Sequence, residues 1–371
     1  MLIKSTRVWV CGRFLSAIIE VEDKKITRIL PYSDQKVDYD FGDKRVLPGF
    51  IDIHCHGAYG FDTNYADPEG LKNWAKNIVN EGITSFCPTT ITELKPVLLK
   101  AVKNVAAVKK ENIPGADILG IHFEGPYLDM EYKGAQPPEA IVAPSVEEFK
   151  EYQEAAEGLI KVITLAPEHD PDFALTRYCS SHNVAVSMGH TGATFEEASL
   201  AIANGVTSVT LNHRKNGVVG AALRTDEIYS EMICDLNHVT ADAIHIFFNC
   251  KGKDHAIMIS DALMCKGSPA GTHFMFGGHE IVVFPDGSAH LVKEGNLAGS
   301  TMKTNEGLRN VVEKAMVPFE YAINSCTINP ARLLHVDDHI GLIRAGYDAD
   351  ITVLEDNYEV VQTFCKGVAQ L

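Results

Sequence analysis

The sequence has no long apolar run and no excess of basic residues. Its 371 residues include 33 Lys and Arg against 49 Asp and Glu, which gives a formal net charge of -16. Nucleic acids and anionic membranes are bound through basic surfaces, so this charge argues against both as partners. No apolar stretch approaches the ~18 residues of a membrane-spanning helix, and the first residues do not resemble a signal peptide. A small anionic ligand stays compatible with the charge, because it needs only a local cation.

Cysteine occurs nine times but never as a Cys-x-x-Cys pair. Cys87 and Cys234 stand within apolar segments, where a reduced and buried thiol is the ordinary interpretation. We therefore expect a reducing, cytoplasmic compartment. The sequence also contains no Gly-x-Ser-x-Gly elbow and no Walker A motif, so neither a serine nucleophile of that type nor that phosphate loop is indicated.

The segment 47–57 ends in two histidines. A turn signal at Pro48-Gly49 is followed by an apolar run that leads into His54 and His56. Alternate residues of a strand point to the same side, so both imidazoles can face one point just beyond the strand. Two neutral imidazoles form half of a site for Zn²⁺ or a similar ion. The alternative is a pair of surface histidines in a loop.

The centre of the chain alternates strands with amphipathic helices. Eight segments have the composition of strands: 50–54, 84–88, 118–124, 161–166, 185–190, 206–211, 231–234 and 256–261. Helix start signals stand between several of them, namely Asp67-Pro68 and possible capping boxes at 145–148 and 194–197. This pattern predicts an α/β fold, a (β/α)8 TIM-like barrel, with a doubly wound open sheet as the alternative.

Both ends of the chain are rich in short strands and lack helical periodicity. We expect residues 1–47 and 346–371 to form one small β-sandwich domain beside a barrel domain at 48–345. Residues 272–294 read as a hairpin around an Asp-Gly turn, which either joins the small β domain or covers the site. A helix is expected over 304–314.

Polar residues stand at the ends of the expected barrel strands. Active sites of such barrels lie at the carboxyl ends of the strands, so these side chains should converge. The residues concerned are His54, His56, Glu124, His190, His238 and Asp261. Each has an ordinary explanation when taken alone, such as a helix N-cap for Asp261 or a core hydrogen bond for His190. Together they predict a divalent metal site.

The motifs of the chain resemble those of a known family. The arrangement of His54 and His56, HFEGP at 122–126, GHT at 189–191 and SD at 260–261 is similar to that of the amidohydrolase superfamily. A closer resemblance, over nearly the whole chain, is to the N-acetylglucosamine-6-phosphate deacetylases. The motifs that carry it are PGFIDIHCHG at 48–57, TSFCPT at 84–89, HFEGPY at 122–127, KGA at 133–135, GVVGA at 217–221 and LAGS at 297–300.

The resemblance implies a metal-dependent hydrolysis of N-acetylglucosamine 6-phosphate to glucosamine 6-phosphate and acetate. It implies one or two divalent ions, such as Zn²⁺ or Fe²⁺, and a homodimer. Asp261 matches the catalytic aspartate. The positions that match metal ligands are His54, His56, Glu124, His190 and Asp261. The positions that match the substrate pocket are Ala135, Gln136, His213, Arg214, His238, Leu297, Ala298 and Gly299.

The match to the family breaks at the sixth strand. The family carries a Thr-His-Leu-aromatic-Asn-x-Met run there, and its histidine completes the metal site. Here Val209-Thr210 runs directly into Leu211, so that histidine and several residues after it are absent from the sequence. Either the protein lacks these residues, or the sequence omits a segment at this point. His213 could replace the missing ligand, although a place beside the phosphate is the preferred role.

Two other functions remain open. One is a different amidohydrolase that acts on a cyclic or acyl amide, as dihydroorotase-like and aminoacylase-like enzymes do. Many of those bridge two metals with a modified lysine, and here the comparable strand offers Glu124 instead. The other is a non-catalytic relative that binds a sugar phosphate without hydrolysing it.

Overall fold

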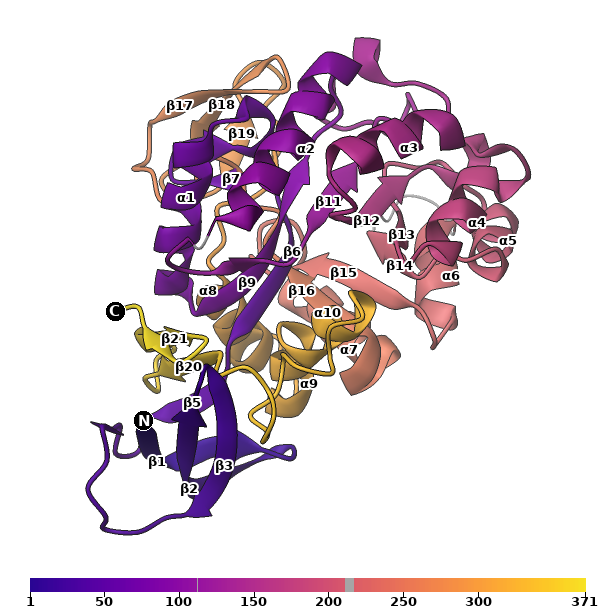
Figure 1. The fold of residues 1–371 in the computed structure, drawn as a ribbon. Helices are drawn as coiled ribbons and strands as arrows, with labels where there is room; N and C mark the ends of the chain where they lie inside the picture. Colours follow the sequence, from indigo (N-terminus) through magenta and orange to yellow (C-terminus); the bar gives the residue numbers. More distant parts are fainter. Residues whose placement is uncertain (112, 211–216) are drawn as a thin grey trace.

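A closed parallel barrel forms the centre of the molecule (Figure 1). The computed structural model describes residues 1–111, 113–210 and 217–371. The barrel strands are β6 (Phe50–Cys55), β9 (Ile83–Thr90), β11 (Ile121–Glu124), β12 (Ile160–Leu165), β13 (Ala185–Met188), β14 (Ser208–Thr210), β15 (Tyr229–Ile233) and β16 (Ala256–Ile259). Each pairs in parallel with the next one along the chain, and the short β10 (Asp117–Ile118) adds to β9.

The barrel closes between its first and last strands. Cys55, at the end of β6, forms a parallel bridge with Ala262, which follows β16. Every residue of β6, β9, β11, β13 and β16 is buried, as expected for parallel strands that are covered on both faces. The predicted (β/α)8 barrel is confirmed, and the open-sheet alternative is wrong.

Helices surround the barrel (Figure 1). They are α1 (Pro68–Asn77), α2 (Lys95–Lys110), α3 (Val146–Ala155), α4 (Ala174–Ser181), α5 (Phe195–Ala203), α6 (Val218–Arg224), α7 (Ala241–His255), α8 (Thr304–Arg309), α9 (Phe319–Ser325) and α10 (Ile328–Leu333). A π-helical turn over Asn310–Lys314 continues α8 and completes the helix expected at 304–314. None of the described helices is both long and apolar enough to cross a membrane.

The predicted helix starts are confirmed, with one difference. The Asp67 side chain caps α1, and Thr194 and Glu197 form a complete capping box on α5. At α3, Ser145 accepts the backbone N–H of Glu148, but the Glu148 side chain does not return to the cap. It accepts the hydroxyl of the buried Tyr127 at 3.2 Å instead, because that donor would otherwise lose a partner in the core.

Strands from both ends of the chain build one further sheet, at the bottom of Figure 1. Its members are β1 (Leu2–Val10), β2 (Arg13–Glu22), β3 (Lys25–Pro31), β4 (Tyr39–Asp40), β5 (Arg45–Pro48), β20 (Ile351–Leu354), β21 (Val360–Cys365) and β22 (Val368–Ala369). The two ends meet where β20 pairs antiparallel with β5, and they share a core that includes Ile19, Val46, Val353 and Phe364.

The expected hairpin at 272–294 forms a three-stranded sheet of its own. Its strands are β17 (His273–Phe276), β18 (His279–Val283) and β19 (Ala289–Leu291), and they pair only with one another among the described strands. They therefore do not extend the sheet of the small β domain. Their core includes Leu263 and Met264 from the segment after β16, and the ring of Phe276 lies 5.9 Å from that of His56. A smaller ribbon of β7 (Gly57–Ala58) and β8 (Phe61–Asp62) follows β6.

We expect Asp350, in the segment before β20, to make stability depend on pH. Burial raises the pKa of its carboxyl group to about 7, although the backbone N–H of Lys366 donates to it at 2.7 Å. An unfolded aspartate loses its proton near pH 3.9, so the folded state holds the extra proton and loses stability as the pH rises from about 4 to about 7. The total loss is at most about 4 kcal/mol.

The measurement compares urea unfolding of the wild type and Asp350→Asn from pH 4 to pH 8. Asparagine keeps the shape and the hydrogen-bond acceptor but does not ionise. The free energy of unfolding of the wild type should therefore fall relative to that of the variant as the pH rises. A constant difference between the two proteins across this range would contradict the prediction.

Candidate active site

Two histidines and a glutamate meet at the carboxyl ends of β6 and β11. Nε2 of His54 lies 3.4 Å from Oε1 of Glu124, and Nε2 of His56 lies 3.4 Å from Oε2. All three side chains are buried, and Glu124 is only 3% exposed. The alternation along β6 therefore places both imidazoles on one side, and the interpretation of His54 and His56 as surface loop residues is wrong.

Asp261 follows β16 and faces the same group. Its Oδ1 lies 3.2 Å from Nε2 of His56 and 3.9 Å from Nε2 of His54. The backbone takes a left-handed conformation, with φ 48°, that is uncommon outside glycine. Two hydrogen bonds hold it there: its N–H donates to the carbonyl of His54 at 2.9 Å, and its carbonyl accepts the N–H of Ser300 at 2.7 Å. No described helix begins at Asp261, so the N-cap interpretation is wrong.

His190 reaches Glu124 from the end of β13. Its Nε2 lies 3.4 Å from Oε1 of Glu124, while its Nδ1 bonds to the carbonyl oxygen of Tyr132 at 3.0 Å. The backbone of His190 is also left-handed, with φ 50°. The hydrogen bond foreseen in the alternative interpretation exists, but it uses only one ring nitrogen and leaves the other directed at Glu124.

Gln136 is tied to the same carboxylate. Its side-chain amide donates to Oε2 of Glu124 at 2.7 Å, and its carbonyl oxygen accepts the backbone N–H of Thr92 at 2.6 Å. Gln136 thus supports Glu124 directly, a contact that the resemblance did not indicate.

A further carboxylate, Glu231, lies behind His54. Nδ1 of His54 and Oε2 of Glu231 are 2.9 Å apart, and both side chains are buried. Glu231 begins the strand expected at 231–234, and no role for its side chain follows from the sequence. The one indication of a role in the sequence is that Glu231 is a charged residue directly followed by the apolar Met232 and Ile233 of the same expected strand.

The charges of this cluster shift each other's protonation. Burial alone would lower the pKa of His54, but the carboxylates of Glu124 and Glu231 outweigh it and raise this pKa well above the ordinary value. Burial alone would raise the pKa of Glu124, but the imidazoles of His190 and His54 lower it well below the usual range. A buried carboxylate such as Glu124, which depends on cationic neighbours, suits a bound cation.

The residues present fit a divalent metal ion. Among the described side chains, the buried Nε2 of His54, which faces Glu124 and Asp261, has no hydrogen-bond partner, and this is costly unless another group satisfies it. One ligand atom each from His54, His56 and Asp261 lies within 4.8 Å of the others. Imidazole nitrogens and carboxylate oxygens are the donors that Zn²⁺ and Fe²⁺ accept.

The predicted substrate residues lie in several places. His238 follows β15, and its Nδ1 is 2.8 Å from Oδ2 of Asp235, whose charge raises the pKa of the histidine against the opposing effect of burial. Ala298 is buried next to the three-stranded sheet together with Ala135, and Leu297 bridges His290 of that sheet. Gly299 adopts a left-handed φ of 48° beside Asp261. His213 and Arg214 lie outside the described residues.

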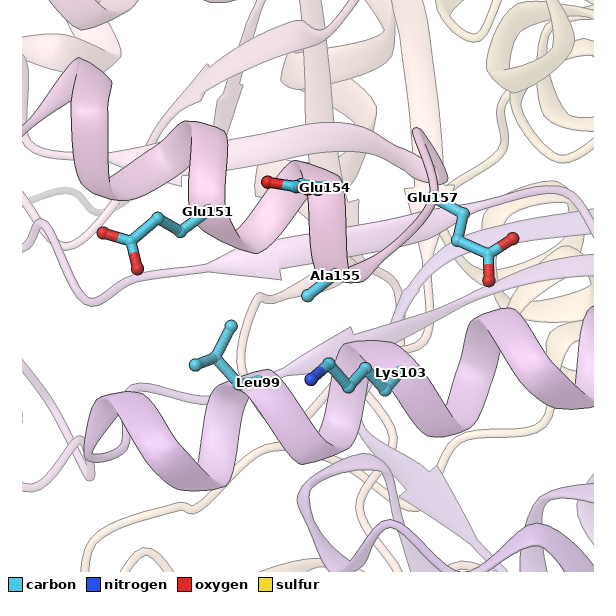
Figure 2. Close-up of a pocket in the computed structure, with 6 residues that line it drawn as sticks. All are labelled: Leu99, Lys103, Glu151, Glu154, Ala155 and Glu157. Atoms are coloured by element: carbon cyan, nitrogen blue, oxygen red, sulfur yellow. The ribbon is translucent and has the colours of Figure 1, made fainter.

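A hollow on the outer surface is separate from this cluster. It lies between α2 and α3 and is lined by Leu99, Lys103, Glu151, Glu154, Ala155 and Glu157 (Figure 2). Three of its six lining residues are glutamates that are exposed to solvent. None of the strand-end residues lines it, so it is not part of the candidate active site.

Comparison with known proteins identifies the family of this chain. The model of the amidohydrolase family matches residues 45–369, and the chain belongs to this family. Within it, the chain is 38% identical to the N-acetylglucosamine-6-phosphate deacetylase of Bacillus subtilis (strain 168), over 88% of this chain and 84% of the relative. It is 31% identical to the N-acetylgalactosamine-6-phosphate deacetylase of Escherichia coli O157:H7, over 87% and 86%.

A solved structure has the same fold over the full length. It is a mutant N-acetyl-D-glucosamine-6-phosphate deacetylase from Mycobacterium smegmatis in complex with N-acetyl-D-glucosamine-6-phosphate. The TM-score is 0.93, the sequence identity 26%, and the match covers 100% of this chain and 99% of that one. The family resemblance inferred from the motifs is thereby confirmed.

We expect the support of Glu124 by Gln136 to be measurable in metal-free protein. Gln136→Leu removes the hydrogen bond to a buried carboxylate and the one from the backbone N–H of Thr92, so the free energy of unfolding should fall by about 2–4.5 kcal/mol. Urea unfolding in the presence of a chelator measures this cost.

Gln153→Leu is the matched control. Gln153 also makes two hydrogen bonds, with the backbone of Ile160 at 3.0 Å each, but it touches no charged group. The loss of these two neutral hydrogen bonds should cost about 1–3 kcal/mol, less than the loss at Gln136. Equal costs for the two variants would show that Gln136 does not stabilise the charge of Glu124.

Proposed function

We propose that this chain is a divalent-metal-dependent deacetylase that hydrolyses the acetamide of N-acetylglucosamine 6-phosphate to glucosamine 6-phosphate and acetate. The observation that carries the proposal is the convergence of His54, His56, Glu124, His190 and Asp261 at one mouth of the barrel. The similarity to deacetylases of this substrate class over most of the chain supports the same conclusion.

The metal ligands in this proposal are His54, His56, Glu124 and Asp261, with His190 and Glu124 as a second position. A divalent ion held by these residues would lower the pKa of a bound water molecule and would polarise the amide carbonyl. Zn²⁺ and Fe²⁺ both suit these donors. Glu124 contacts both positions, which makes it the ligand on which the whole site depends.

Asp261 is the proton carrier of the proposed reaction. Its side chain is 22% exposed, whereas those of His54, His56 and Glu124 are at most 5% exposed, so Asp261 borders the open side of the site. It accepts a proton from the attacking water and returns the proton to the amide nitrogen as the bond to the acetyl carbon breaks. The two backbone hydrogen bonds of Asp261 fix the backbone from which its carboxylate projects toward the histidines.

The phosphate of the substrate requires a cation near the mouth. His238 holds its proton to a higher pH than an ordinary histidine, because of the carboxylate of Asp235, and it can carry this charge. Arg214 is the second candidate, by resemblance alone; a guanidinium binds phosphate through two parallel hydrogen bonds. The three-stranded sheet of β17–β19 reaches the site through Phe276, whose ring lies 5.9 Å from that of His56. A homodimer stays a prediction.

A second candidate substrate is the 4-epimer, N-acetylgalactosamine 6-phosphate. The observation in its favour is the 31% identity to a deacetylase named for that sugar. Both sugars have the same acetamide and phosphate, so the chemistry at the metal site is common to the two. Turnover of each as the only substrate, followed by acetate release, distinguishes them, and no acetate from either would favour a different amide substrate or a binding protein.

We expect Asp261→Asn to fold normally and to lose catalysis. Asparagine keeps the size and polarity of the side chain but does not accept a proton, so kcat should fall by the ~10²–10⁴-fold that is typical of a lost general acid–base, with KM little changed. Steady-state kinetics of acetate release measure the effect, and melting curves of both proteins show whether the fold is intact. A stable variant whose kcat stays within threefold of the wild type would contradict the role of Asp261.

A further inference from the structure

The His54 side chain has a fixed partner on the side away from the other proposed ligands. We propose that Glu231 is a positioning residue that fixes the orientation and the tautomer of His54 for metal binding. The inference rests on the metal site of the proposed function, and it assigns a role to a residue outside the set of ligands.

Glu231 is enclosed in the barrel. It lies on β15 and is 1% exposed. Its Oε1 accepts the hydroxyl of Ser208 at 2.9 Å and that of Ser187 at 3.4 Å, while the hydroxyl of Thr210 is 3.5 Å from its Oε2. These donors belong to β13 and β14, so two neighbouring strands hold the carboxylate in one position.

The contact between Glu231 and His54 defines which ring nitrogen carries the proton. An ionised carboxylate only accepts hydrogen bonds, so Nδ1 of His54 is the donor at 2.9 Å. In the neutral imidazole that metal binding requires, the proton on Nδ1 leaves the lone pair on the other nitrogen, Nε2. This is the atom that faces Glu124 and Asp261 and has no hydrogen-bond partner among the described residues. A metal-binding histidine commonly donates its second N–H to a carboxylate, which orients the ring and raises its basicity.

The neighbouring His122 does not compete for this role. Its Nδ1 bonds to the carbonyl oxygen of Ile53 at 2.9 Å and its Nε2 to the hydroxyl of Thr164 at 2.7 Å, so neither nitrogen is free for an ion. Its ring packs against that of His54, with centroids 4.3 Å apart. The close group of His54, His122 and Glu231 is therefore a support of the proposed ligand and not a second metal site.

The cost of a buried carboxylate gives a further reason for this assignment. An ionised group in the interior is expensive unless it is paired and hydrogen-bonded, and an apolar side chain is commonly as stable there. Glu231 makes four contacts, with three hydroxyls and one imidazole. The imidazole is that of His54, and it links the buried carboxylate to the proposed metal site.

The experiment measures the affinity for Zn²⁺ alone, by competition with a chromophoric chelator, in wild type, Glu231→Gln and the control Asp350→Asn. Both variants replace one buried carboxylate by an amide, but Asp350 lies beside β20 and touches none of the proposed ligands. We expect Glu231→Gln to bind Zn²⁺ about 10–100-fold more weakly. Asp350→Asn should stay within twofold of the wild type. Circular dichroism of the metal-free proteins checks that both variants fold.

Ser208→Ala is the second variant, because it removes one hydrogen bond from Glu231 without touching a proposed ligand. We expect a roughly threefold weaker affinity, in keeping with the loss of a single hydrogen bond. This variant decides the question if Glu231→Gln does not fold. Wild-type affinity in every folded variant of the pair would overturn the role of Glu231. A wild type that binds no Zn²⁺ at all would instead overturn the metal site of the proposed function.

Discussion

Glu124 is a buried carboxylate surrounded by three imidazoles and one amide, and the site is built around this arrangement. A charge at 3% exposure is stable only with cationic or hydrogen-bonding partners. His54, His56 and His190 supply three of them at 3.4 Å, and Gln136 supplies the fourth at 2.7 Å. A divalent ion between these groups would relieve the same constraint, because it satisfies the carboxylate and the unpartnered Nε2 of His54 together.

The barrel meets this constraint with backbone geometry as well as with side chains. His190 and Asp261 both leave their strands in a left-handed conformation, and each is held there by backbone hydrogen bonds to neighbouring segments. Such conformations are costly and gather at functional sites, where the surrounding structure maintains them. The Asp261 bonds also join β6 to the segment after β16, so barrel closure and the placement of the proposed proton carrier are one feature.

Much of the fold and of the candidate site could be predicted from the sequence, because the spacing of apolar residues indicates the strands and polar residues mark where the strands end. The eight barrel strands, the two-ended β domain and the strand-end residues were all readable from apolar runs that stop at polar residues. The role of Glu231 was not, because it depends on which face of β15 looks inward and on hydroxyls from β13 and β14 that only the barrel register brings together. The same holds for Gln136, whose contact with Glu124 spans 12 positions of loop. The capping box expected at 145–148 is incomplete for the same reason: the Glu148 side chain accepts the hydroxyl of the buried Tyr127, a contact that only the tertiary structure creates.

The central claim is that one ion lies between His54, His56, Glu124 and Asp261. The most direct measurement is anomalous diffraction above and below the zinc absorption edge, from crystals grown with Zn²⁺. We expect a peak at the carboxyl end of β6, bounded by the Nε2 atoms of both histidines and the carboxylate of Asp261. A peak only at the partly exposed group of Asp129, Glu168 and His169, with none in the barrel mouth, would contradict this position.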